Sequence, residues 1–492
     1  MSRTSGILMH ITSLPSPGGI GTLGHEAFAF ADFLQASGMR IWQVLPIGPT
    51  GYGESPYQST SVFAGNPLLI SCELLEEEGL LTCDPKEIFV PEDETRVDYE
   101  AVRKNKTALL RKCFRQSGEK LSSELAAFRR ENPWVEDFAL FTALKEKFNG
   151  VMWTKWPDPD LQFRKPEALE KARKELKTEI DYHVFCQFLF RKQWFALKQY
   201  CNDRGIQLFG DMPIYVAEDS ADTWTHPEVF QLNRDRLPKR VAGVPPDYFS
   251  ADGQLWGNPL YRWTRLRFCH HFDWWVERMR GMASLYDMIR IDHFIGFANY
   301  YSIPYGAPNA RNGKWVKGPG KALFKRLQAE VPDIRIIAED LGAVNRRVRK
   351  LLDWCGYPGM KVLTFGFDSD ETNPHHPSHY TQNCVAYTGT HDNDTVRGWA
   401  DKADPKVLAF AEKEIGFHGP EEAPEAMVKA LFASPCDTVI VPMQDLLGLG
   451  GEARMNYPGT IGGNWLWRMR DGELTAALSM RLYTLNRETN RR

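Results

Sequence analysis

Three acidic residues stand at the ends of short apolar segments of this sequence. Asp292 follows Met-Ile-Arg-Ile, Glu339 follows Ile-Ile-Ala, and Asp392 follows Tyr-Thr-Gly-Thr-His. Burying a carboxylate beside apolar residues is costly unless it is paired or used. Carboxylates that share one cavity push each other's pKa values apart, so one can stay protonated while its neighbour is ionised. Cleavage of a glycosidic bond needs that pair of states: an acid for the leaving oxygen and an anion facing the anomeric carbon.

Each acid also has a structural interpretation, because a strand-end Asp often caps the next helix and Arg290 beside Asp292 could form a plain ion pair. Alternate strand residues share one face, so we expect Arg290 to hold Asp292 ionised at neutral pH, as a nucleophile requires. Glu339 has only the more distant Arg335 on its face, and we expect a raised pKa for it. Residues 391–394 (His-Asp-Asn-Asp) lack a full calcium loop, so no metal is predicted.

The elements that must position these acids are short apolar runs alternating with helical stretches. The predicted strands are residues 6–10, 41–46, 206–211, 286–292, 334–339, 361–365, 384–388 and 438–442. The predicted helices between them include residues 26–37, 181–201, 321–330 and 344–354. Eight alternations predict an α/β fold of the (β/α)8 TIM-barrel class. A doubly wound open sheet is the alternative, but no Gly-rich phosphate loop follows the first strand.

The spacing of the strands is uneven, and this predicts insertions into a single barrel domain spanning residues 1–492. Residues 50–204 are expected to form a mainly helical subdomain, with helices at 109–116, 134–148 and 166–189. Residues 212–285 are expected to be substrate-covering loops, and residues 389–437 a helical segment. All three leave the carboxyl ends of strands, where barrel enzymes build their active sites. Too few residues follow the eighth strand for a C-terminal β-sandwich.

Composition excludes several classes of protein. Lys and Arg number 60 against 63 Asp and Glu, for a net charge of −3, and 43% of residues are hydrophobic. This excludes a disordered chain and disfavours non-specific nucleic-acid binding. The 15 Trp residues suit either a large core or stacking on sugars. Nine Cys without CxxC spacing favour a reducing compartment, and no apolar run approaches the ~18 residues of a spanning helix. We therefore predict a protein that does not enter the membrane and lies in the cytoplasm, with an organelle lumen after loss of a transit peptide as the alternative.

Long motifs along the chain resemble one family. They are Gly-Ile-Leu-Met-His-Ile-Thr-Ser-Leu-Pro (6–15), Trp-Gln-Val-Leu-Pro-Ile-Gly-Pro-Thr (42–50), Ser-Pro-Tyr-Gln-Ser (55–59), Gly-Asp-Met-Pro-Ile-Tyr-Val (210–216), Gly-Val-Pro-Pro-Asp-Tyr-Phe (243–249), Trp-Gly-Asn-Pro (256–259), Asn-Tyr-Pro-Gly-Thr (456–460) and Gly-Asn-Trp (463–465). In these motifs the sequence resembles the 4-α-glucanotransferases (amylomaltases, disproportionating enzymes), a branch of the α-amylase superfamily. Ile11 departs from the pattern, since the family is expected to have Pro there.

The resemblance implies that Asp292 is the nucleophile, Glu339 the general acid/base and Asp392 a third acid that holds sugar hydroxyls. The predicted substrate-binding residues are Tyr57, Asp211, Tyr215, Tyr248, Phe249, Trp256, Arg290, His391 and Asn464. The implied reaction is a retaining double displacement through a covalent glycosyl-enzyme, without a cofactor. The carboxyl oxygens of Asp292 and Glu339 should then lie ~5–5.5 Å apart.

The implied partners are malto-oligosaccharides and α-1,4-glucans derived from starch or glycogen, with glucose or maltose as acceptor; the oligomeric state is left open. Transfer requires a site that excludes water, and residues 242–249 offer apolar, aromatic and Pro-stiffened cover. Two alternatives stay open: a hydrolase of the α-amylase type and a non-catalytic glucan-binding barrel. Incubation with maltotriose separates them, since a transferase yields a ladder of oligosaccharides plus glucose, a hydrolase yields a steady gain of reducing ends, and a binding protein yields no change.

Overall fold

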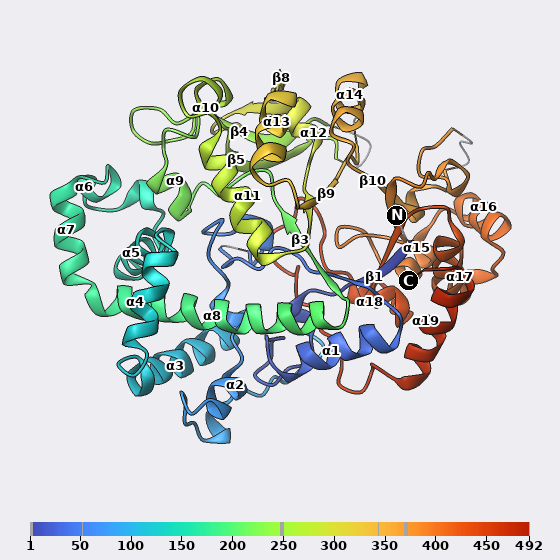
Figure 1. Ribbon diagram of the computed structural model, residues 1–492. Helices are drawn as coiled ribbons and strands as arrows, with labels where there is room; N and C mark the ends of the chain where they lie inside the picture. The colour runs from blue at the N-terminus through green and yellow to red at the C-terminus, as the bar shows by residue number, and fades with distance from the viewer. Residues whose placement is uncertain (1–2, 52, 247–249, 343, 369–371, 492) are drawn as a thin grey trace.

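Eight parallel strands form the central sheet of the computed structural model, which describes residues 3–51, 53–246, 250–342, 344–368 and 372–491. Their order is β10-β11-β12-β1-β2-β3-β6-β9 (Figure 1). The strands are β1 (Thr4–Leu8), β2 (Ile41–Gln43), β3 (Gln207–Met212), β6 (Met288–Ile291), β9 (Arg335–Ala338), β10 (Gly359–Val362), β11 (Cys384–Tyr387) and β12 (Thr438–Pro442). Each of the eight predicted runs overlaps one of them, and the fold is a (β/α)8 barrel.

The first and last strands of this order close the barrel through few contacts. The Ala338 N–H at the end of β9 donates to the Pro358 carbonyl oxygen at 3.0 Å, and the Met360 N–H of β10 donates to the Asp340 carboxylate at 2.7 Å. Elsewhere the strands are buried on both faces, as β12 shows with all five residues buried. Burial on both faces explains why these strands read as continuous apolar runs.

Helices cover the outside of the barrel. The outer helices include α1 (His25–Ala36), α8 (Lys177–Asp203), α11 (Asp273–Leu285), α13 (Lys321–Glu330), α14 (Arg346–Cys355), α16 (Pro405–Ile415), α17 (Gly419–Ala433) and α19 (Ala476–Glu488). Helices α1 and α8 run side by side (Figure 1), and the Phe28 and Tyr200 rings join them with centroids 4.8 Å apart. The two ends of the chain also meet, because Arg491 Nη1 donates to the Thr4 carbonyl oxygen at 3.3 Å.

The long connection between β2 and β3 is mainly helical. Its helices are α2 (Cys72–Glu77), α3 (Tyr99–Ser117), α4 (Ser122–Glu131), α5 (Trp134–Lys147), α6 (Pro159–Gln162), α7 (Pro166–Glu175) and α8. Several of them share an apolar cluster of their own, which contains Trp153, Trp156 and Trp224. The single helix predicted over residues 166–189 is wrong, because Leu176 leaves the helical conformation (φ −102°, ψ 22°) and separates α7 from α8.

A second, antiparallel sheet was not predicted. It has the order β5-β4-β7-β8, with β4 (Arg240–Val244), β5 (Gln254–Pro259), β7 (Asn299–Pro304) and β8 (Lys314–Lys317). Strands β4 and β5 lie in the segment expected to consist of covering loops. The register between β4 and β5 shifts between Val241 and Gly243, which breaks the alternation that sequence patterns rely on.

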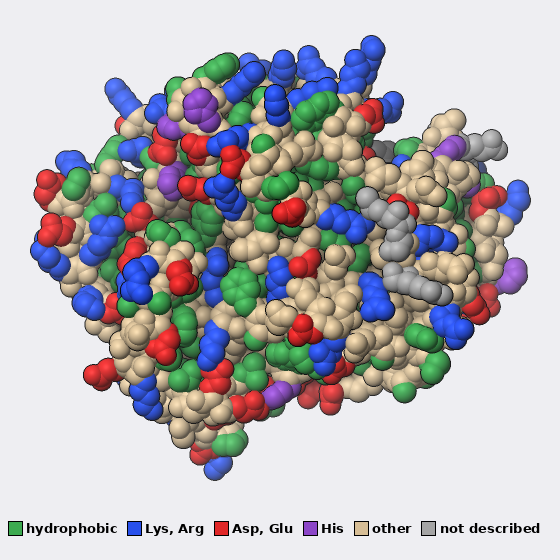
Figure 2. Space-filling view, in the orientation of Figure 1, with side chains coloured by type: hydrophobic (Ala, Val, Ile, Leu, Met, Phe, Trp, Pro, Cys, Tyr) green, Lys and Arg blue, Asp and Glu red, His purple; other side chains and the backbone are tan. Residues whose placement is uncertain are grey.

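Helices and a long irregular segment make up the last part of the chain. After Pro442 the described residues form α18 (Met443–Leu446), a short 3-10 turn, an irregular segment over residues 454–475 and α19, and contain no strand. In the described part of the chain no helix is both long and apolar enough to cross a membrane. Figure 2 shows Lys and Arg side chains gathered over β8, α13 and α14, where Lys314, Lys317, Lys321 and Lys325 are exposed. The small net charge therefore conceals one basic edge.

Candidate active site

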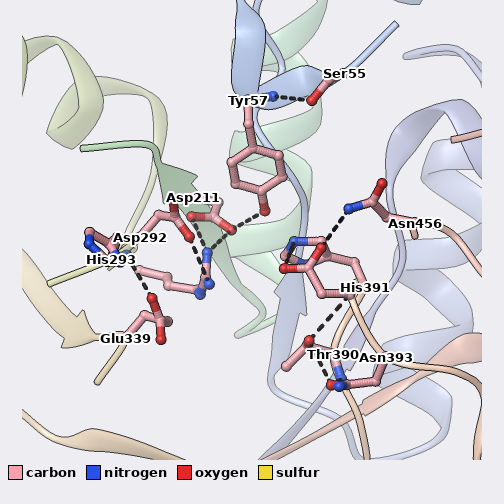
Figure 3. A network of polar contacts seen from close by, with 12 residues as sticks. Ser55, Tyr57, Asp211, Asp292, His293, Glu339, Thr390, His391, Asn393 and Asn456 are labelled. Carbon is pink, nitrogen blue, oxygen red and sulfur yellow. Dashed lines mark hydrogen bonds and ion pairs between the residues drawn. The ribbon is translucent and has the colours of Figure 1, made fainter. Parts of the chain in front are cut away.

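Three neighbouring strands bring charged side chains to one end of the barrel. Strand β6 lies between β3 and β9, Asp211 of β3 is in register with Arg290 of β6, and Asp292 and Glu339 follow β6 and β9 directly. Figure 3 shows Asp211, Asp292 and Glu339 pointing into a common region, with His391 and Tyr57 facing them. The structure therefore brings together the first two predicted acids.

Arg290 divides its charge between two carboxylates. Its Nη1 lies 2.8 and 2.6 Å from the two oxygens of Asp211, and its Nη2 lies 3.0 Å from Oδ1 of Asp292. The Tyr57 hydroxyl also donates to Asp211 Oδ2, at 2.7 Å. Asp211 is fully buried, so its carboxylate orients Arg290 and Tyr57 in this structure. Its predicted contact with a sugar stays a prediction.

Glu339 is held by backbone amides. The His293 N–H donates to Glu339 Oε2 at 2.7 Å, and the Leu341 N–H donates to Oε1 at 2.6 Å. His293 reaches this position with a φ of 50°, a left-handed conformation that is uncommon outside Gly. Such backbone outliers gather at functional sites, where the surrounding structure enforces them. The turn after β6 therefore places both Asp292 and the amide that holds Glu339.

Burial dominates the protonation of this pair. It raises the pKa of Asp292 to about 8, against the opposing effect of Arg290. It also raises the pKa of Glu339 to about 7, as expected, again opposed by Arg290. Arg290 thus acts on the pKa of Asp292 in the expected direction, but burial has the larger effect. The ionised state of Asp292 at neutral pH stays a prediction. Because the carboxyls of Asp292 and Glu339 interact, the protonation of each depends on that of the other near neutral pH.

Asp392 lies in the loop after β11 and is held by residues far along the chain. Asn456 Nδ2 donates to Asp392 Oδ1 at 2.7 Å, and Arg454 Nη2 donates to the Asp392 carbonyl oxygen at 2.7 Å. Asp392 Oδ2 lies 3.4 Å from His391 Nε2, and its side chain is 42% exposed. Burial lowers the pKa of His391, which favours a neutral ring. Arg454 and Asn456 were not predicted as site residues, although Asn456 opens one of the quoted motifs.

Aromatic rings line two sides of this region. The Tyr57 ring stacks on His391 with centroids 5.0 Å apart and planes 17° apart, and Trp465 lies 5.9 Å from each of them. On the other side, the ring centroid of Trp256 lies 6.1 Å from that of Tyr215. It also lies 4.9 Å from the His293 ring. The predicted substrate-binding residues Tyr57, Tyr215 and Trp256 are thus near the acids.

Three other predicted substrate-binding residues have different outcomes. Tyr248 and Phe249 lie outside the described residues. Asn464 is 5% exposed, and its side chain braces its own loop: Oδ1 accepts from the Tyr457 N–H at 3.0 Å and Nδ2 donates to the Thr460 hydroxyl at 3.0 Å. Its predicted contact with substrate remains a prediction.

In residues 391–394, the side-chain oxygens of Asn393 and Asp394 bind other groups of the protein. Asn393 Oδ1 accepts from the Thr390 N–H and hydroxyl, both at 2.9 Å, and Asp394 Oδ2 lies 2.6 Å from Lys402 Nζ. Among the described residues no three His, Cys, Asp or Glu side chains lie together as metal ligands. The arrangement instead suits acid–base and nucleophilic chemistry on a neutral substrate.

Known proteins resemble this chain along almost its whole length. The sequence profile described as 4-alpha-glucanotransferase matches residues 9–475. The chain is 46% identical over 503 aligned residues to a 4-alpha-glucanotransferase of Thermus thermophilus, covering 100% of this chain and 99% of that protein. It is 44% identical over 483 residues to one from Clostridium butyricum, covering 97% and 99% of the two chains.

Solved structures agree with the sequence relatives. An amylomaltase from Streptococcus agalactiae, solved in complex with acarbose, superposes with a TM-score of 0.97 at 43% identity and covers 99% of both chains. An amylomaltase from Corynebacterium glutamicum shares the fold, with a TM-score of 0.76 at 20% identity, covering 100% of this chain and 75% of that one. The profile match and the identity over nearly the full length show that the chain belongs to the 4-alpha-glucanotransferase family.

Proposed function

We propose that the chain cleaves α-1,4 bonds of malto-oligosaccharides or starch-type glucans and transfers the glucanosyl unit to the 4-OH of a second glucan or glucose. Relatives named 4-alpha-glucanotransferase support the reaction class. The observation that carries the residue assignment is the placement of Asp292 and Glu339 at the ends of adjacent strands in unlike surroundings. Asp292 contacts a guanidinium, and Glu339 contacts backbone amides.

In the first step Glu339 gives its proton to the glycosidic oxygen, and the bond from that oxygen to the anomeric carbon breaks. A carboxylate oxygen of Asp292 attacks the anomeric carbon and forms a glycosyl ester, while the shortened glucan leaves with a new hydroxyl. If Asp292 and Glu339 hold one proton between them, the reaction requires the proton on Glu339 and the negative charge on Asp292. Arg290, 3.0 Å away, supports that form because it stabilises an ionised Asp292 against the opposing effect of burial.

In the second step the 4-OH of an acceptor attacks the anomeric carbon of the ester. Glu339, now ionised, takes the hydroxyl proton, and the bond to Asp292 breaks, which restores both carboxyls. Asp392 and His391 would hold hydroxyls of the reacting sugar and favour its distortion. The open carboxylate of Asp392 and the neutral state favoured for His391 support those roles.

Transfer rather than hydrolysis requires a sugar to win against water at about 55 M in the second step, so water must be excluded. The aromatic walls formed by Tyr57 with Trp465 and by Tyr215 with Trp256 support such exclusion, because they present flat apolar area on two sides of the acids. The same rings offer stacking surfaces for sugars. Linear α-1,4-glucans are therefore the proposed donors, and glucose or maltose the smallest proposed acceptors.

The experiment is incubation with pure maltotriose, followed by separation of the products by length. A transferase yields glucose together with longer oligosaccharides at a constant number of reducing ends. A rising number of reducing ends would identify a hydrolase, and unchanged maltotriose would identify a binding protein. The Asp292→Asn variant serves as the matched control, since it keeps the fold and the size of the side chain.

We further propose that the enzyme works in the cytoplasm. All nine cysteines are free thiols in the structure, and this supports a reducing compartment. Fractionation of cells that express the full chain would test the location.

A further inference from the structure

A buried carboxylate that the proposed reaction does not use lies behind the loop of Asp392. Asp445 belongs to α18, directly after β12, and is 3% exposed. Burial raises its pKa to about 6. No ion pair with Lys, Arg or His is formed by Asp445 within the described ranges, and its hydrogen bonds alone offset the cost of burying its charge. Burying a charge without a counter-ion costs free energy. The position of Asp445 therefore needs a structural or functional explanation.

The two oxygens of Asp445 join the two ends of one loop. Oδ2 accepts from the Thr388 hydroxyl at 2.6 Å, and Oδ1 accepts from the Val396 N–H at 2.8 Å. Thr388 lies four residues before Asp392, and Val396 lies four residues after it. One carboxylate therefore closes the nine-residue segment that has Asp392 at its centre.

The tip of this loop is a tight turn with its own hydrogen bonds. Thr390 donates both its N–H and its hydroxyl to Asn393 Oδ1 at 2.9 Å. The Asp392 N–H lies 3.3 Å from the Thr390 hydroxyl oxygen. Because the tip is braced internally, the position of its ends sets the position of His391 and Asp392.

The same short helix also contacts the segment that holds Asp392 from outside. Gln444 Nε2 donates to the Ala453 carbonyl oxygen at 3.3 Å. The next residue is Arg454, which binds the Asp392 backbone, and Asn456 binds its carboxylate. Helix α18 thus contacts both segments that determine where Asp392 lies.

A small cavity adjoins this loop. It has a volume of about 20 Å³, lies beside His391, and is also lined by Asp394, Asp445, Arg454 and Met455. A space of this size has room for about one water molecule. The hydrogen bonds of Asp445 therefore add to those of Arg454 and Asn456 in fixing the position of the loop.

From this geometry we propose that Asp445 is a positioning residue that sets His391 and Asp392 for transfer, through Thr388 and Val396. The inference rests on the proposed role of Asp392 in the reaction. Asp445 does not touch substrate in this proposal; it acts only through the loop.

The test compares Asp445→Leu with Asp445→Asn in steady-state disproportionation of maltotriose. Leu removes both acceptors, and misplacement of a reacting group by about 1 Å costs on the order of a hundredfold. We expect kcat to fall tenfold to a hundredfold with KM changed less than threefold. Asn keeps an oxygen for the Val396 N–H and can donate to the Thr388 hydroxyl, so we expect it to stay within about threefold of the wild type.

The matched control is Asp287→Asn at the opposite end of β6. The Asp287 carboxylate accepts from the Leu208 N–H at 2.8 Å and from Asn202 Nδ2 at 2.9 Å. Asp287 also pairs with Lys198 Nζ at 3.4 Å. This variant perturbs a hydrogen-bonded carboxylate away from the loop of Asp392, and we expect its kcat to equal that of the wild type. If Asp445→Leu does not fold, Thr388→Val replaces it, since that near-isosteric change removes one of the two bonds. A kcat for the folded variant equal to that of the wild type would overturn the proposal.

A double-mutant cycle tests the route of action, with labelled maltotriose to detect slow turnover. If Asp445 acts through His391 and Asp392, adding Asp445→Leu to Asp392→Asn lowers kcat by less than the same change lowers it in the wild type, because one of the two positioned residues is already lost. An equal further fall in the double variant would refute the proposal. Full activity of Asp392→Asn alone would instead refute the proposed role of Asp392, so the two failures are distinguishable.

Discussion

The two halves of the active site are built in different ways. Asp292 and Glu339 follow adjacent strands, and the hydrogen bonds that hold Glu339 come from amides within two residues of either acid. Asp392 lies in a loop, and the side chains that hold it are 62 and 64 residues away along the chain. The strand-end half takes its geometry from the barrel, whereas the loop half depends on individual side chains. Substitution of a neighbouring residue should therefore lower activity more when that residue holds Asp392 than when it lies near Asp292 and Glu339.

The largest effect is expected for Asp292→Asn, which removes the proposed nucleophile and keeps the size of the side chain. Without the covalent intermediate, kcat should fall by about four to six orders of magnitude. Product analysis of maltotriose incubations with a labelled acceptor measures this range. Retention of even a tenth of the wild-type kcat in a folded variant would remove Asp292 from the mechanism.

A fall of about a hundredfold to ten-thousandfold is expected for Glu339→Gln, because general acid–base catalysis contributes that much. Glu339 must be protonated to act as an acid, and burial raises its pKa to about 7. Wild-type kcat/KM should therefore decline as the pH rises through this pKa. The Gln variant has no proton to lose there, so its residual activity should lack that basic limb. A basic limb unchanged in the variant would assign the acid to another group.

The same contrast explains what the sequence could predict. The eight strands were predictable because each is an apolar run buried on both faces, and the acids were recognisable because they stand at or just beyond the ends of such runs. The predicted barrel also makes β3 and β6 neighbours. The surroundings of Asp292 were not predictable, since they depend on how deeply its carboxyl is buried and on which oxygens each nitrogen of Arg290 contacts.

The supports of Asp392 were beyond prediction for a related reason. Asp445, Arg454 and Asn456 are polar residues without periodicity, and each meets the loop only after the chain has returned to it. Strands β4 and β5 escaped prediction because their register shift interrupts the alternation of side chains. The structure therefore reveals two kinds of feature that the sequence did not predict: long-range polar contacts and irregular strands.

A smaller effect is expected for Asn456→Ala, which removes the donor to Asp392 Oδ1. A hydrogen bond to a charged group is worth about 1.5–3 kcal/mol, so kcat/KM should fall roughly tenfold to a hundredfold. Asn456→Asp should be worse, because it sets a second negative charge against Asp392. Tyr457→Phe is the control, since the ring can remain over Arg454. Wild-type kcat/KM for the Ala variant would show that the contact does not matter.

The smallest effect separates two roles for Asn464. If this residue only braces its loop, Asn464→Asp retains an acceptor for the Tyr457 N–H and should stay within about twofold of wild-type kcat/KM. Asn464→Ala loses that acceptor and should cost roughly fivefold, the equivalent of about 1 kcal/mol. If the amide instead donates to a sugar, both variants lose the donor and Asp should be at least as harmful as Ala. Steady-state kinetics with maltotriose thus decide whether Asn464 contacts the substrate or, like Asn456, supports a loop.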